Sequence, residues 1–179
     1  YINALTKTAA TRKRAKRKRK KMMNYTVTVI GGGFAGVEAA MQLAKRGIKV
    51  RLFEMKPHRF SPAHKSEDLC EVVCSNSFKS LLPASAAGLL KNEMELLGSV
   101  CVKCAKQTAV PAGGALAVDR DLFSAAVTAE IEKEPLIEIV REEITKIPDE
   151  GVVIIAAGPL ASDALSEEIK RLCGGGLSF

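Results

Sequence analysis

A run of glycines between two apolar segments is the feature that most constrains the fold of this chain. Thr26 to Ile30 alternates β-branched residues and predicts a buried strand. The next residues, 31–36, read Gly-Gly-Gly-Phe-Ala-Gly and contain the G-x-G-x-x-G spacing. Helical spacing over Ala35 to Arg46 and a second apolar run over Ile48 to Phe53, before Glu54, complete the pattern. Strand, turn, helix and strand together predict the βαβ unit of a dinucleotide-binding site.

Each of the three glycines of the G-x-G-x-x-G spacing has its own predicted role. Gly31 permits a tight turn after the strand, Gly33 lets the backbone approach a pyrophosphate, and Gly36 lets the helix pack closely on the strand. The positive end of the helix dipole faces the phosphates. Glu54 can accept hydrogen bonds from the two hydroxyls of an adenosine ribose, and its charge repels a 2′-phosphate. The pattern therefore predicts a site for FAD or NAD rather than NADP.

The basic residues are concentrated at one end of the chain. Ten of the 27 Lys and Arg residues lie within the first 21 positions, and the remainder holds 17 basic against 20 acidic residues, a net charge of −3. Residues 12–21 repel one another and cannot bury apolar area, so we expect residues 1–23 to form a disordered basic leader. The leader is either a tail that binds nucleic acid or a non-native extension ahead of a start at Met22 or Met23.

No apolar run approaches the roughly 20 residues that span a bilayer, and no apolar segment of a secretory signal follows the basic residues. We therefore expect a cytoplasmic protein with no membrane partner. The oligomeric state has no signal in the sequence.

The cysteines offer one possible metal site. Cys70 and Cys74 together with Cys101 and Cys104 could supply four thiolates to zinc. The spacing of the first pair is loose, and the two pairs lie in different contexts, one polar and one half-buried. The sequence therefore favours reduced thiols and no metal.

The middle of the chain predicts further helices. Ala84 to Leu97 has an amphipathic pattern, and Asp119 is a predicted N-cap for a helix over Arg120 to Lys133. Between them, Val110 to Val118 contains Gly113-Gly114 among apolar residues, which predicts backbone packed tightly against a ring or another strand.

The last part of the chain predicts short strands. Residues 137–140 and 143–147 predict a small β excursion, and residues 152–156 predict a buried strand followed by Ala157-Gly158, a second turn that can approach a dinucleotide. The fold class is therefore α/β: a three-layer, Rossmann-like FAD-binding domain over residues 24–172, with a central parallel sheet, a small β excursion and a truncated C-terminal edge. Residues 173–179 are expected to be an irregular end.

Several longer motifs extend this pattern beyond the glycines. They are Val29–Gly36, Leu52–Pro57, Pro62–Lys65, Val73–Ser77, Val110–Arg120 and Ala156–Leu165. In this order they resemble the folate- and FAD-dependent tRNA (uracil-5-)-methyltransferases, close relatives of the GidA-type tRNA-modifying flavoproteins. The resemblance runs from about Tyr25 to Leu172.

The resemblance implies methylation of the T-loop uridine 54 of tRNA at C5, with 5,10-methylenetetrahydrofolate as carbon donor, FAD as cofactor and NAD(P)H as reductant. The implied FAD-binding residues are Gly31, Gly32, Gly33, Phe34, Ala35, Gly36, Glu54, Ala157 and Gly158. Cys74 matches a cysteine expected near the flavin, which makes it either a reactive thiol or a structural loop thiol.

The chain departs from the family in two respects that bear on activity. Ala157 stands where the family usually has Thr, and family members are more than twice this length. The resemblance implies that the main nucleophile lies beyond Phe179, so we expect this polypeptide alone to be inactive. The alternatives are a GidA-type flavoprotein that modifies the wobble uridine, an oxidoreductase of small molecules, and a non-catalytic FAD-binding fragment.

Overall fold

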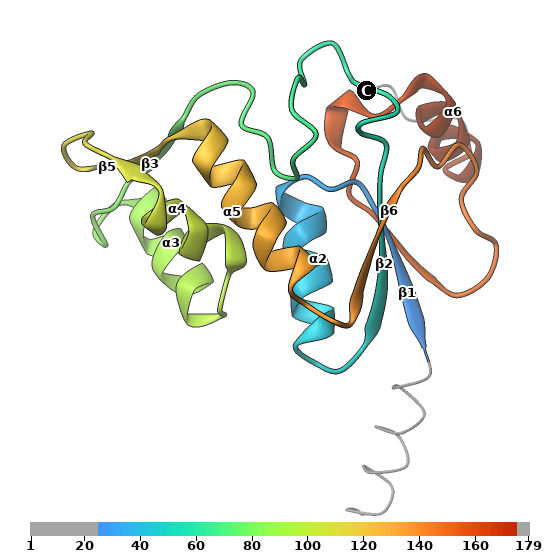
Figure 1. Ribbon diagram of the computed structural model, residues 1–179, viewed down its shortest axis with the longest axis horizontal. Helices are drawn as coiled ribbons and strands as arrows, with labels where there is room; N and C mark the ends of the chain where they lie inside the picture. Colours follow the sequence, from blue (N-terminus) through green and yellow to red (C-terminus); the bar gives the residue numbers. More distant parts are fainter. Residues whose placement is uncertain (1–24, 175–179) are drawn as a thin grey trace, which may run out of the picture.

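A four-stranded parallel sheet forms the centre of the protein (Figure 1). The structure, a computed structural model, describes residues 25–174; the predicted leader lies outside these residues, as does most of the predicted irregular end. The strands lie in the order β6 (Ile137–Arg141), β2 (Lys49–Glu54), β1 (Thr26–Ile30) and β7 (Val152–Ile155). The predicted α/β class with a central parallel sheet is confirmed.

Strand β1 is an inner strand of the sheet and pairs in parallel with β2 on one side and β7 on the other. Val29 lies opposite Leu52 of β2 on one side and Ile154 of β7 on the other. Successive side chains point to opposite faces of a strand, so Val29 is buried in the larger apolar cluster and Ile30 in the smaller one. The sheet is therefore packed on both faces.

Helices on the two faces complete a three-layer arrangement. Helix α2 (Phe34–Ala44) and helix α5 (Arg120–Glu132) lie on one side of the sheet, and helix α6 (Asp163–Leu172) lies on the other (Figure 1). Asp119 caps α5 by accepting hydrogen bonds from the backbone N–H groups of the first turn, as predicted. Phe123 of α5 is fully buried in the larger cluster.

A second, smaller sheet lies beside the main body. It is antiparallel, in the order β3 (Ser77–Ser80), β5 (Ala115–Val118) and β4 (Ala109–Val110), and the helices α3 (Ala86–Leu96) and α4 (Val100–Gln107) pack near it. The β excursion was predicted over residues 137–140 and 143–147, and that placement is wrong. The first of these segments is β6, the edge strand of the central sheet, and the second forms no strand.

Two local expectations from the sequence are also wrong. Gly113 and Gly114 form the tip of the β4–β5 hairpin, where a Cβ atom would meet nothing within 4 Å. Cys101 and Cys104, expected in a half-buried segment, lie on helix α4 and are buried.

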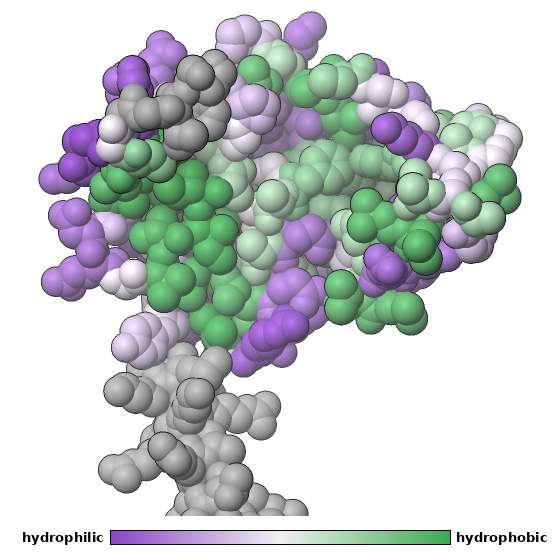
Figure 2. All heavy atoms as spheres, turned by 180° about the vertical axis from the view of Figure 1, so that it is seen from behind, coloured by the Kyte–Doolittle hydropathy of each residue, from purple (hydrophilic) through white to green (hydrophobic). Residues whose placement is uncertain are grey.

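Apolar side chains are exposed at the edge of the central sheet. Strand β7 has a neighbour on one side only, and Val152 and Ile155 on it are 53% and 42% exposed. Figure 2 shows hydrophobic residues gathered on the face seen from behind. Among the helices of residues 25–174, none has the length and apolar character required to cross a membrane.

Candidate functional site

The glycine turn follows β1 directly and packs against the segment after β7. Gly31 has a φ of +106°, and a Cβ atom there would lie 2.6 Å from the carbonyl oxygen of Ala156. The Gly31 N–H donates to the carbonyl of Phe53 over 2.8 Å. Only glycine fits this position, because a side chain meets both a strained backbone and a close backbone neighbour.

Gly36 has a different reason to lack a side chain. A Cβ atom on Gly36 would lie 1.8 Å from the carbonyl oxygen of Gly31, so the first turn of α2 rests directly on the glycine turn. The helix therefore starts close to the end of β1, with its positive end beside the turn.

Gly33 is the one glycine of the three that faces open space. Its φ of −78° is ordinary, it is the N-cap of α2 without a side-chain hydrogen bond, and a Cβ atom there would meet nothing within 4 Å. The first backbone N–H groups of a helix lack partners within the helix, and together with the dipole they attract an anion. This arrangement is suited to a phosphate group that approaches the backbone at Gly33.

Glu54 lies at the end of β2 and is fixed by two backbone hydrogen bonds. One carboxylate oxygen accepts from the N–H of Gly32 over 2.9 Å, and the other accepts from the N–H of Lys56 over 3.0 Å. The residue is only 8% exposed. Each oxygen can accept a second hydrogen bond, so the carboxylate is held in place with capacity left for a ligand hydroxyl.

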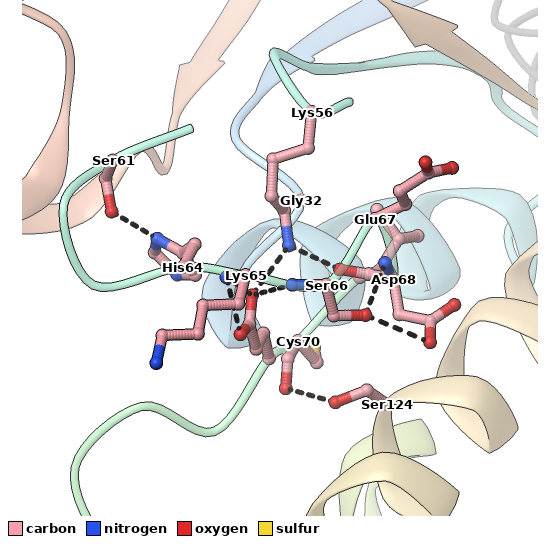
Figure 3. A network of polar contacts seen from close by, with 12 residues as sticks. Gly32, Lys56, Ser61, His64, Lys65, Ser66, Glu67, Asp68, Cys70 and Ser124 are labelled. Atoms are coloured by element: carbon pink, nitrogen blue, oxygen red, sulfur yellow. Dashed lines mark hydrogen bonds and ion pairs between the residues drawn. The ribbon is translucent and has the colours of Figure 1, made fainter. Parts of the chain in front are cut away.

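A polar network holds the loop after β2 against the glycine turn (Figure 3). The buried Lys56 ammonium donates to the carbonyl of Asp68 over 2.5 Å and forms an ion pair with Glu71 at 3.4 Å. The Arg141 side chain, at the end of β6, donates to the carbonyls of Lys56 and Glu67. These contacts hold residues 55–71 at Lys56 and again at residues 67–71, and we call this segment the pinned loop.

The same loop reaches the glycine turn through its backbone. The N–H of Cys70 donates to the carbonyl of Gly32 over 2.9 Å, and the Oγ of Ser124 donates to the carbonyl of Cys70. In this loop, His64 and Ser61 are joined by a hydrogen bond of 2.5 Å. These contacts give the wall of the site a defined shape.

A cavity lies where these elements meet. The glycine turn, the end of β2 and the pinned loop form one wall, and residues 142–144 with the start of α6 form the other. Glu143 on the second wall forms an ion pair with Arg59 of the loop at 2.7 Å, which joins the two walls. Hydrogen bonds from the Arg59 and Ser162 side chains, together with the Arg59 charge, outweigh burial and lower the pKa of Glu143.

The cavity brings together part of the predicted site. Its lining includes five of the predicted residues: Gly31, Gly32, Gly33, Glu54 and Ala157. Phe34 does not line it but stacks on Phe123, with ring centroids 5.6 Å apart. Gly158 begins the short helix η1 (Gly158–Leu160) with a φ of +67°.

Cys74 does not line this cavity. The residue is exposed, and its carbonyl accepts a 3.5 Å hydrogen bond from Arg120. Of the other thiols, Cys70 and Cys101 lie with their sulfur atoms 3.9 Å apart. Within residues 25–174, no three His, Cys, Asp or Glu side chains converge in the manner of a metal site.

Lys56, Glu71 and Arg141 were not among the residues predicted for the site. Arg141 and Lys56 are 85 positions apart, so no local spacing joins them. The motif at Leu52–Pro57 includes Lys56, but the sequence predicts no contact for this side chain.

Glu71 gives the loop a measurable pH dependence. Burial opposes its ionisation, but hydrogen bonds from the N–H groups of Lys65 and Ser66, with the Lys56 charge, hold its pKa below the ordinary 4.5. A lowered pKa stabilises the fold above pH 4.5, and this stability is lost as the pH falls through the folded-state value. We expect the free energy of unfolding to fall less between about pH 6 and about pH 3.5 in Glu71→Gln than in the wild type. Urea denaturation at the two pH values measures this difference. Glu67→Gln, an exposed carboxylate of the same loop, should keep the wild-type slope.

Comparison with known proteins identifies a family that matches this chain. The family described as "Glucose inhibited division protein A" matches residues 26–173. The protein named "Methylenetetrahydrofolate--tRNA-(uracil-5-)-methyltransferase TrmFO" from Citrifermentans bemidjiense is 59% identical over 157 residues, which are 88% of this chain and 36% of that protein. The protein of the same name from Lactobacillus gasseri is 57% identical over 152 residues, 85% of this chain and 35% of that protein. This chain thus spans about a third of the length of these curated relatives.

Among solved structures, the p-nitrophenol 4-monooxygenase PnpA from Pseudomonas putida DLL-E4 matches with a TM-score of 0.47 at 16% identity, over 70% of this chain and 35% of that one. This similarity is too distant to support a statement about function.

Proposed function

Because this chain belongs to the family of glucose inhibited division protein A, we propose that it forms the FAD-binding part of a flavoprotein that methylates uracil at C5 in tRNA. The proposal includes uridine 54 of the T loop as the target, 5,10-methylenetetrahydrofolate as the carbon donor and NAD(P)H as the reductant. Since the chain spans about a third of its relatives' length, methyl transfer is proposed for the whole protein and not for this polypeptide alone.

The observation that carries the FAD proposal is the open space at Gly33, at the start of α2, where no side chain caps the helix. A pyrophosphate at this point would accept hydrogen bonds from the first backbone N–H groups of the helix. Glu54, fixed by the N–H groups of Gly32 and Lys56, would accept the ribose hydroxyls. The residues present therefore fit the ADP half of FAD.

When bound, the flavin supplies the redox chemistry of the reaction. The part of the chain described by the structure would bind and orient it. The pinned loop, through Lys56 and Arg141, would keep the ribose carboxylate in place. The residues that act on uracil are proposed to lie in the part of the relatives that this chain does not span, and Cys74 stays a candidate thiol outside the cavity.

A visible absorption spectrum tests the FAD site directly. We expect the purified chain to keep flavin bands through desalting after addition of FAD, and Gly33→Val to weaken binding by at least about tenfold. The Gly33 position has an ordinary φ and no neighbour within 4 Å, so a side chain there should block the ligand and leave the fold in place.

Ala125→Val is the control for Gly33→Val, because it adds a branched side chain at an exposed position of α5. It should retain FAD like the wild type. A wild-type chain that takes up no FAD although it unfolds cooperatively would refute the proposed site.

A further inference from the structure

The lining of the cavity carries an excess of negative charge, contributed by both walls. Its lining includes four carboxylates: Glu54, Glu71, Glu142 and Glu143. The one lysine in the lining is Lys56. A phosphate on the adenosine ribose would therefore meet carboxylates, unless the lysine were free to receive it.

The Lys56 ammonium is not free. Its side chain is 4% exposed, and Nζ donates to the carbonyl of Asp68 at 2.5 Å and faces Glu71 at 3.4 Å. The Glu71 carboxylate is itself held by the N–H groups of Lys65 and Ser66, at 2.8 and 3.1 Å. The ion pair is partly buried, since the Glu71 side chain is 16% exposed, and it is anchored on both sides, so the folded loop sets its geometry.

Lys56 also connects this pair to the ribose carboxylate. Its backbone N–H donates to Glu54 at 3.0 Å, while its carbonyl accepts from Arg141 at 3.3 Å. One residue thus positions Glu54 through its backbone and engages Glu71 through its side chain. A change in the ion pair alters the charge that a ligand meets beside Glu54.

We propose that Glu71 is a specificity-determining residue that engages the Lys56 ammonium and so closes the ribose end of the site to nucleotides with a 2′-phosphate. This inference rests on the proposed nucleotide site. Glu54 alone repels a 2′-phosphate, but a free lysine in the same cavity would offset that repulsion. Glu71 removes this compensation, and Lys56 is the positioning residue through which it acts.

The test compares two ligands that differ only in the 2′-phosphate, adenosine 5′-monophosphate (AMP) and adenosine 2′,5′-bisphosphate. Binding of each is measured by isothermal titration calorimetry. The wild type should prefer AMP, and Glu71→Gln should lower the ratio of the two dissociation constants by about tenfold. This ratio is insensitive to a general loss of stability, because both ligands use the same folded chain.

Two further variants separate the role of Glu71 from general charge effects. Glu67→Gln removes the same charge from an exposed position of the same loop outside the cavity lining, and it should leave the ratio unchanged. In a Lys56→Met background, Glu71→Gln should no longer lower the ratio, since the ammonium charge that Glu71 neutralises is absent.

The outcomes distinguish the two proposals. An unchanged ratio in Glu71→Gln, or an equal change in Glu67→Gln, would overturn the role of Glu71 while AMP binding upheld the nucleotide site. A wild-type chain that binds neither AMP nor FAD would overturn the nucleotide site and this inference with it.

Discussion

Replacement of Gly36 by alanine is expected to lower the free energy of unfolding by about 3 kcal/mol or more and to abolish FAD uptake. The added Cβ atom would lie 1.8 Å from the carbonyl oxygen of Gly31, and neither backbone segment can move without disturbing β1 or α2. Urea denaturation of the purified variant measures the loss.

Gly33→Ala is the matched control, since it adds the same methyl group three residues earlier in the same turn. Nothing lies within 4 Å of that position, so the expected cost is about 1 kcal/mol or less, the scale of an altered N-cap. Equal losses in Gly36→Ala and Gly33→Ala would contradict the close approach of α2 to the glycine turn.

Replacement of Glu54 by arginine is expected to remove FAD binding below detection. The change places a cation where two backbone N–H groups, those of Gly32 and Lys56, converge on a carboxylate. Both donors lose their acceptor, and the ribose hydroxyls lose theirs. Glu54→Gln keeps one acceptor oxygen and should weaken FAD binding by about 10- to 100-fold, measured by fluorescence titration.

Glu142→Gln controls for charge in this experiment. Glu142 lines the same cavity, but it is exposed and lies on the wall opposite Glu54. It should bind FAD within about threefold of the wild type, the scale of an exposed charge. If Glu142→Gln were as damaging as Glu54→Gln, the effect would come from the charge of the cavity and not from ribose recognition.

The first βαβ unit could be predicted from the sequence because its signals are local. The alternation over Thr26–Ile30 predicts the strand β1. The glycine spacing predicts a turn without room for side chains, and the structure has such positions at Gly31 and Gly36. The same is true of α5, where Asp119 and the buried Phe123 follow short-range rules.

The errors concern elements that depend on distant partners. A short apolar segment such as Ile137–Arg141 reads the same as a hairpin strand or as the edge of a parallel sheet, and only its pairing with β2 decides. Helix α3 has the predicted amphipathic pattern, yet Leu90 on its apolar face is 56% exposed. The Lys56–Glu71 pair could not be predicted either, because a contact within an irregular loop has no periodic pattern in the sequence.

The three glycines of the G-x-G-x-x-G spacing face different kinds of selection. Gly31 and Gly36 are required by the backbone around them, whereas Gly33 is free of neighbours within the protein. A descendant lineage released from nucleotide binding could therefore accept side chains at position 33 while it retained glycine at the other two. A substitution confined to position 33 would mark a lineage that kept the fold after it lost nucleotide binding.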